Sequence, residues 1–330
     1  KADVRREVDI IEEVLRIYGF NAVEARSGQR VPLPSGDNRR EKMQQHVSEY
    51  LSSHGFYEII SNSVTRSSYP SPEGDTGRVD ILNPLSPELN AMRRTLLYSG
   101  LEAIAYNRNR KRPDLKMYEF GKTYHLNASV PPSEDVRKRY TEHRRLACFL
   151  TGRKLPERWN APHAAVDFFH TSAFVHSILR RLGIAQGILR ETLPSGHPVF
   201  SAGMLVRSGK EILAEYGTVK KSVLQTVDIG GEVFFADLNW ERLVELAASR
   251  KFVYKDLPKY PEVRRDLALV LDKHVRYEDL EKLAFATVKK LLREVCLFDV
   301  YEVIKIGEGK KSYAVSFILQ DEEATLTEIG

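Results

Sequence analysis

Four acidic side chains near the start of the chain have a spacing that suits a metal ion. They form the pattern D-x5-D-x2-E-E and consist of Asp3, Asp9, Glu12 and Glu13. Hard carboxylate oxygens on one helix face suit Mg²⁺, which accepts a few carboxylates and keeps several waters. From the residues alone the favoured alternative is a solvated acidic helix face, since charged faces are the rule on surface helices.

A second set of side chains, near the C-terminal end, combines cations with aromatic rings. It consists of Arg264, Arg265, Lys289, Lys290, Phe298, Tyr301, Lys310 and Lys311. Unpaired RNA bases are bound by stacking on aromatic rings, with cationic contacts to phosphate. Strand alternation separates Phe298 from Tyr301 and favours a core position for Phe298, as is usual for large aromatics in strands. The two lysine pairs fit solubilising charge equally well.

The sequence gives little support for a disulfide, a zinc site or a serine hydrolase. Cys148 and Cys296 are far apart in apolar, β-like runs. That placement favours buried, reduced thiols over a disulfide or a zinc site and is typical of a reducing cytoplasm. No G-x-S-x-G motif occurs, so the sequence does not indicate a serine hydrolase.

These residues belong to consecutive blocks of the chain. Residues 1–26 end in one amphipathic helix stopped by a glycine, and the Pro-containing residues 27–36 indicate a linker. Residues 37–254 alternate between strand-like runs, one over Tyr57–Val64, and helical runs, which predicts an α+β domain with a sheet covered by helices. Residues 255–330 form the last block.

The last block has a β-α-β-β order. Strand-type runs at Tyr260–Leu271 and Leu297–Leu319 flank a helical run at Tyr277–Leu292. A split β-α-β fold also needs a second helix and a fourth strand. The chain ends at Gly330, just after a spacing at Thr325–Glu328 that is typical of a helix-starting capping box. The block therefore reads as incomplete.

Composition indicates a globular chain, with 42% hydrophobic and 29% charged residues, and no apolar run reaches membrane-spanning length. The net charge of +5 is unevenly distributed. Residues 27–254 carry 32 basic against 24 acidic side chains, whereas residues 255–330 carry 13 against 15. Charge alone therefore assigns a polyanionic partner to the middle block, and RNA binding by the last block must come from local placement of Arg and Lys.

Four strings of residues, in order, resemble the β chain family of bacterial phenylalanyl-tRNA synthetases. They are DVRREVDIIEEVLRIYGF (Asp3–Phe20), NPLSPELNAMRRTLLYSGLEAIAYNRNR (Asn83–Arg110) with LKMYEFGKTY (Leu115–Tyr124), GHPVFSAGMLVRSGKEILAEYGTV (Gly196–Val219), and YPEVRRDLALVL (Tyr260–Leu271) with LFDVYEVIKIGEGKKSYAVSFIL. The resemblance implies the end of a winged-helix-like (B5-type) module at 1–26, a class II synthetase-like antiparallel sheet at 37–254, and a split β-α-β, ferredoxin-like anticodon-binding domain at 255–330.

The resemblance also indicates that the catalytic groups are missing. Class II synthetases present an Arg to the α-phosphate after a strand of the type F-E-I-G-x-x-F-R, and here Tyr118–His125 matches that frame with His125 in the Arg position. A neutral imidazole cannot replace the bidentate cation. The later Gly-rich strand is also absent, and the G-x-G at Gly307 and Gly309 is better explained as a hairpin turn.

As a member of this family, the chain is expected to be a non-catalytic part of a cytoplasmic α2β2 ligase that joins phenylalanine to tRNA(Phe). The resemblance implies assembly with a catalytic α chain and a second β chain, ATP bound by that α chain, and Mg²⁺ shared with it at Asp3, Asp9, Glu12 and Glu13. It also favours Arg264 and Arg265 as tRNA contacts, because they open a closely matching strand. The alternative is a standalone RNA-binding or scaffold protein that reuses the same modules.

Overall fold

The computed structural model describes residues 4–24, 28, 38–71, 74, 76–131, 135–160, 162–184, 187–250, 254, 256–301 and 309–326. The predicted linker at 27–36, apart from Gly28, lies outside these residues, as do Asp3, Gly307 and the end of the predicted capping box. The chain divides into two compact units, residues 1–251 and 252–330. No helix among the described residues combines the length and the apolar composition required to cross a membrane.

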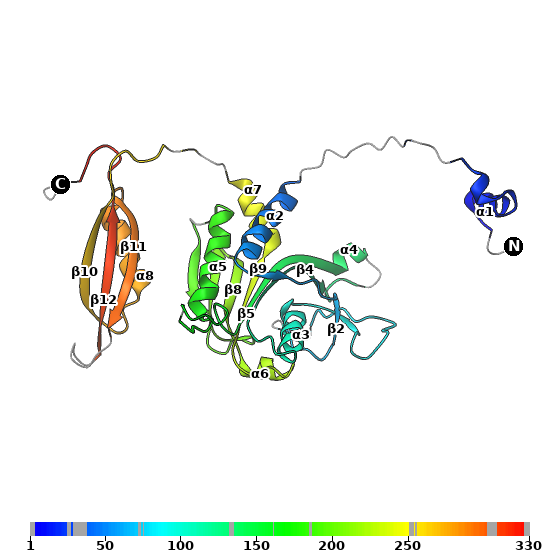
Figure 1. Ribbon diagram of the computed structural model, residues 1–330, viewed down its shortest axis with the longest axis horizontal. Helices are drawn as coiled ribbons and strands as arrows, with labels where there is room; N and C mark the ends of the chain where they lie inside the picture. Colours follow the sequence, from blue (N-terminus) through cyan, green and yellow to red (C-terminus); the bar gives the residue numbers. More distant parts are fainter. Residues whose placement is uncertain are drawn as a thin grey trace. The chain divides into compact units, whose positions relative to one another are not determined.

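The elements of the first unit run in the order drawn in Figure 1. The helices are α1 (Glu7–Tyr18), the 3-10 turn η1 (Phe20–Ala22), α2 (Arg39–Ser53), α3 (Leu97–Arg108), α4 (Val136–Arg139), α5 (Phe168–Arg181), α6 (Lys221–Gln225) and α7 (Trp240–Ser249). The strands are β1 (Tyr57–Glu58), β2 (Val64–Thr65), β3 (Ala91–Met92), β4 (Leu115–Leu126), β5 (Tyr140–Thr151), β6 (Leu189–Thr192), β7 (Phe200–Ser208), β8 (Glu211–Val219) and β9 (Val233–Asn239).

Seven of these strands form one sheet in the order β1-β4-β5-β9-β8-β7-β6. Only the short edge strand β1 runs parallel to its neighbour; the other pairs are antiparallel. Strands β4 and β5 pair over 12 residues, from Leu115 opposite Thr151 to Leu126 opposite Tyr140. The sheet and its helices confirm the predicted α+β class.

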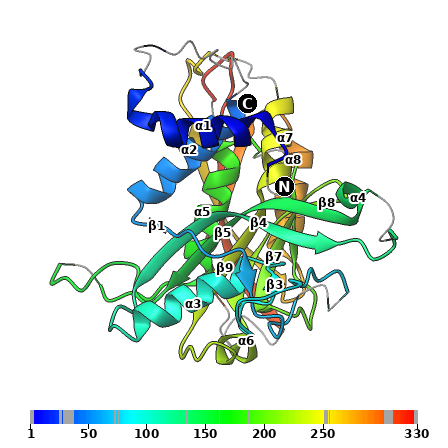
Figure 2. The same cartoon turned by 90° about the vertical axis from the view of Figure 1, so that its right-hand side faces the viewer.

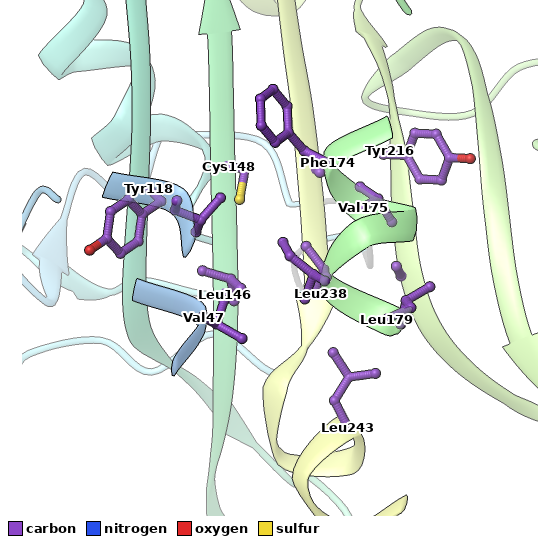
Figure 3. Close-up of a cluster of buried hydrophobic side chains, with 14 of the residues drawn as sticks. Val47, Tyr118, Leu146, Cys148, Phe174, Val175, Leu179, Tyr216, Leu238 and Leu243 are labelled. Carbon is purple, nitrogen blue, oxygen red and sulfur yellow. The ribbon is translucent and has the colours of Figure 1, made fainter. Parts of the chain in front are cut away.

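Side chains of the sheet build a core on each face. One face packs on α2, α5 and α7, and Figure 3 shows Val47 and Leu179 of these helices beside Leu146 and Leu238 of the strands. The other face packs on α3 and α6, through residues such as Leu101. Figure 2 shows α2, α5 and α3 about the sheet from a second side. Because strand side chains alternate between faces, both sets of positions must be apolar, which explains the continuous apolar run of β5.

The predicted strand over Tyr57–Val64 is wrong in extent. Only Tyr57 and Glu58 pair with β4, and Val64 belongs to the separate two-stranded sheet β2-β3. The reason is a side-chain hydrogen bond: the Ser61 Oγ donates to Glu119 at 2.6 Å, and this contact draws the segment away from backbone pairing with β4. Tertiary hydrogen bonds of this kind override local strand propensity.

Glu119 of β4 is also half of a buried ion pair. The Arg93 Nη1 lies 2.7 Å from the Glu119 Oε1, with the two side chains 5% and 2% exposed. The Arg93 Nη1 also donates to the Ser61 Oγ, and its Nε donates to the Lys122 carbonyl. A Cβ on Gly121 would stand 2.5 Å from the Arg93 Nη2, so only glycine leaves room for the guanidinium. The pair therefore joins three segments that are far apart in sequence.

The second unit consists of β10 (Val263–Asp272), α8 (Tyr277–Val288), β11 (Leu292–Tyr301) and β12 (Lys310–Leu319). The strands form an antiparallel sheet in the order β10-β12-β11, and α8 covers one face. This confirms the β-α-β-β order. The predicted helix to Leu292 ends four residues earlier, because Lys289, with φ of 20°, leaves the helical region. β11 then begins at Leu292 instead of Leu297.

We expect Glu119→Gln to lower the free energy of unfolding by about 3–5 kcal/mol, because it leaves the Arg93 guanidinium buried without its counter-ion. Urea unfolding measures the change. Lys122→Gln is the matched control: it breaks the exposed 2.6 Å ion pair to Glu142, which is worth at most about 1 kcal/mol. Equal, small effects of the two substitutions would contradict a structural role for the buried pair.

Candidate functional site

The three-stranded sheet of the second unit has one face covered by α8 and one face left open. On the central strand β12, Tyr313, Val315 and Phe317 pack in the core under α8. The alternate positions Ser312, Ala314 and Ser316 therefore point to the open face. These small side chains form a low floor between the two outer strands. The sequence signal was the alternation of small and large residues in KSYAVSFIL.

A β-bulge places an aromatic ring on this open face. Leu297 pairs with Val315 and Asp299 pairs with Ala314, so Phe298 is the extra residue in β11. A bulge leaves two consecutive side chains on the same side of the strand. Phe298 is 50% exposed, so the core position favoured from alternation is wrong. Tyr301, opposite Ser312, shares the open face and is 55% exposed.

Arg264 reaches this ring from β10, on the far side of the floor. Its guanidinium carbon lies 5.3 Å from the centroid of the Phe298 ring, within the range of a cation–π contact. Its Nε donates a 2.8 Å hydrogen bond to the Asp266 carboxylate, which raises the pKa of Arg264. The exposed ring, its cation and Tyr301 form a surface that can stack unpaired planar bases.

The other residues predicted to contact tRNA do not all lie on the open face. Arg265 is opposite Phe317, so it points to the α8 side, whereas Lys310 is opposite Asp272 on the open face. Lys311 is 8% exposed and its ammonium lies 4.6 Å from the centroid of the Tyr313 ring, on the α8 side. Lys289 and Lys290 follow α8 in the turn before β11. The structure thus brings Arg264, Phe298, Tyr301 and Lys310 together on one face and does not add the other four.

The open face does not carry a surplus of positive charge. Besides the cations Arg264 and Lys310, this face bears four carboxylates, those of Asp266, Asp272, Glu294 and Asp299. Such a face suits stacking and hydrogen bonding to bases better than contact with phosphates.

Cys296 also faces the open side, where it is opposite Ser316. Its side chain is exposed, so the prediction of two buried thiols is wrong for Cys296 and right for Cys148. Burial raises the pKa of the Cys148 thiol. A thiol reagent would therefore report on the open face through Cys296.

On the sheet of the first unit, two arginines are paired with carboxylates. Arg145 of β5 makes a bidentate pair with Asp237 of β9, at 2.9 and 2.7 Å. Glu119 accepts a single 2.7 Å hydrogen bond from the Arg93 Nη1. His125, in the position of the phosphate-gripping Arg, lies with its Nε2 3.2 Å from the Thr123 Oγ1. Cations committed to buried carboxylates do not provide a phosphate clamp.

Two acidic side chains of α1 bind groups in or next to the same helix. The Asp9 Oδ2 accepts hydrogen bonds from the backbone N–H groups of Arg5 and Arg6, which lowers the pKa of Asp9. Glu13 pairs with Arg16 at 2.7 Å. In the parts of the chain that the structure describes, no group of three or more His, Cys, Asp or Glu side chains is arranged to hold a metal ion. Asp9 and Glu13 therefore already have partners among the described residues.

Comparison with known families gives two matches along the chain. Residues 29–240 match the family described as "Phenylalanyl tRNA synthetase beta chain CLM domain", and residues 258–329 match "Ferredoxin-fold anticodon binding domain". The second match covers the sheet with the open face.

Individual relatives agree with these matches. Proteins named phenylalanine–tRNA ligase beta subunit are 43% identical in Bacteroides fragilis and Bacteroides thetaiotaomicron and 30% identical in Syntrophus aciditrophicus, each over 99% of this chain. The chain spans about 40% of the length of these curated relatives. A pyrrolysyl-tRNA synthetase from Desulfitobacterium hafniense aligns with a TM-score of 0.47 and 12% identity, over 73% of this chain and 77% of that one.

Proposed function

The chain belongs to the phenylalanyl-tRNA synthetase β chain family, and we propose that it is part of a β subunit of phenylalanine–tRNA ligase. In this proposal the second unit binds the anticodon region of tRNA(Phe). The first unit holds the β subunit to a catalytic α chain, within an α2β2 assembly that contains a second β chain and acts in the cytoplasm. The division at 251–252 and the family matches support the predicted modules at 37–254 and 255–330.

The observation that carries the RNA-binding role is the open face of β10-β12-β11. An unpaired base can stack on Phe298, because the ring is exposed above a floor of small side chains. The Arg264 guanidinium already stands within cation–π distance of that ring, so it is placed to contact an inserted base from above. Anticodon loops supply unpaired bases, whereas a helical stem does not.

We propose that the first unit is pseudo-catalytic. The Arg93–Glu119 and Arg145–Asp237 pairs support this role, since two arginines of the sheet are committed to carboxylates. Amino-acid activation requires preorganised cations directed at the α-phosphate of ATP. ATP is accordingly assigned to the α chain. The single-subunit alternative, a standalone RNA-binding protein, shares the open face but needs no α chain.

The predicted Mg²⁺ site stays part of this proposal only as a site completed by another chain. Asp9 caps its own helix and Glu13 pairs with Arg16, so Glu12 is the predicted ligand without a local partner among the described residues. If Glu12 helps to hold Mg²⁺, Glu12→Gln will weaken the Mg²⁺ dependence of α–β association measured by analytical ultracentrifugation. Unchanged Mg²⁺ dependence would remove Glu12 from the ligand set.

Phe298→Ala should weaken binding of the tRNA(Phe) anticodon stem-loop by about 5- to 150-fold, because one base–aromatic stack contributes about 1–3 kcal/mol. Fluorescence anisotropy measures the affinity, and protection of Cys296 from a thiol reagent by the same RNA is a second readout. Phe285→Ala is the matched control, since Phe285 is also exposed but belongs to α8. Equal affinities for the two variants, together with an unprotected Cys296, would exclude the open face.

The chain alone should give no phenylalanine-dependent ATP–pyrophosphate exchange, since the described residues around His125 provide no phosphate clamp. Adding the α chain as a positive control should restore exchange. Appreciable phenylalanine-dependent exchange by the chain alone would end the pseudo-catalytic proposal.

A further inference from the structure

The turn that follows α3 concentrates positive charge on the first unit. Within five residues it carries four cations, Arg108, Arg110, Lys111 and Arg112. No ion pair involves any of them among the residues that the structure describes, and the Nη1 of Arg108 is buried without a hydrogen-bond partner. Some other exposed cations of this unit are paired with carboxylates, as Arg66 is with Glu88. We name this segment, residues 108–112, the basic turn.

The backbone holds the basic turn in one fixed shape. Its backbone N–H groups donate hydrogen bonds to carbonyls at the end of α3. Those of Arg110 and Arg112 donate to the Asn107 carbonyl, and that of Lys111 donates to the Arg108 carbonyl. Lys111 has φ of 61°, a left-handed conformation that costs a non-glycine residue about 1–2 kcal/mol. Gly or Asn would be less strained at this position.

A hollow of about 480 Å³ lies beside the basic turn. Its lining residues are Tyr57, Ile59, Asn107, Lys111, Arg112, Pro113, Asp114, Leu115, Met117 and Arg153. Asp114 is the one carboxylate in this lining, and Arg153 neutralises it through a 2.9 Å hydrogen bond from Nε and a 2.8 Å hydrogen bond from the backbone N–H. Gly152 permits this approach, because a Cβ there would stand 2.4 Å from the Asp114 Oδ1. Lys111 and Arg112 therefore remain as uncompensated charge at the hollow.

The chemistry of the basic turn favours contact with a phosphate backbone over base stacking. The guanidinium carbon of Arg110 lies 3.4 Å from the centroid of the Tyr106 ring and so covers one face of that ring, although Tyr106 is 58% exposed. The exposed cations Arg110, Lys111 and Arg112 are consecutive residues of this turn. Sequence-independent binding of nucleic acid depends on Lys and Arg contacts of this kind.

We propose that the basic turn and its hollow bind the sugar–phosphate backbone of tRNA outside the anticodon stem-loop. The inference rests on the proposed function only for the identity of the RNA as tRNA. It accounts for the uneven charge of the chain: residues 27–254 hold an excess of basic side chains, whereas the open face of the second unit bears four carboxylates. The second unit contacts bases, and the first unit neutralises phosphates.

The test compares two double variants of the chain. In Lys111→Asn/Arg112→Gln, both charges are removed and Asn relieves the left-handed strain at 111, so the fold is preserved. Arg137→Gln/Lys138→Gln removes two exposed charges from α4 and is the matched control. Binding to a full-length tRNA(Phe) transcript and to its anticodon stem-loop is measured over a range of salt concentrations.

The first variant is expected to bind the full transcript roughly tenfold more weakly and to lower the slope of log K against log salt by about two units, one for each lost phosphate contact. Its affinity for the stem-loop should not change, and the control should bind both RNAs as the unmodified chain does. An unchanged slope, an equal loss in the control, or an equal loss for the stem-loop would overturn the inference. Weaker association with the α chain at unchanged tRNA affinity would overturn it too, in favour of a protein interface.

This test is separable from that of the proposed function. Phe298→Ala reports on the open face through the stem-loop, whereas Lys111→Asn/Arg112→Gln reports on the basic turn through the rest of the tRNA. If Phe298→Ala has no effect while the basic-turn variant loses affinity, the anticodon assignment fails and the phosphate-binding surface stands.

Discussion

The buried ion pair between Arg93 and Glu119 is the constraint on which the arrangement of the first unit depends. A charge pair with both members at most 5% exposed is tolerated only when hydrogen bonds satisfy the remaining donors and acceptors. Ser61 and the Lys122 carbonyl provide them. Three requirements follow: the segment after β1 must leave the sheet, residue 121 must be glycine, and the chain must enter α3 directly from Arg93.

The position of α3 in turn determines what the unit presents at its surface. Leu97, Leu101 and Ile104 anchor the helix to the sheet, so its C-terminal end is fixed beside β1 and β4. The basic turn is at that end, where cations also interact favourably with the helix dipole. The sheet face on which α3 packs is thus filled by this helix and by internal ion pairs. The cations available to a partner lie at the rim of the sheet instead.

In the two proposals, the units divide RNA recognition by the chemistry of their surfaces. The open face of β10-β12-β11 offers an exposed ring, one stacked cation and several carboxylates, which together favour bases over phosphates. At the basic turn, the first unit offers the exposed cations Arg110, Lys111 and Arg112. Such a division separates sequence discrimination, which needs short-range contacts to bases, from affinity, which comes mainly from phosphate neutralisation.

The sequence by itself determined the fold class and the family, because both rest on local periodicity or on residue identities. It also placed Arg264 and Arg265 on a strand, where alternation alone separates them onto opposite faces. It gave the wrong side for Phe298, since one extra residue in a strand reverses the alternation and the bulge is set by pairing with β12. The same limit applies to the pairing of Arg93 with Glu119, 26 positions apart, and to the capping role of Asp9. These depend on which segments meet in three dimensions, and only the tertiary structure decides that.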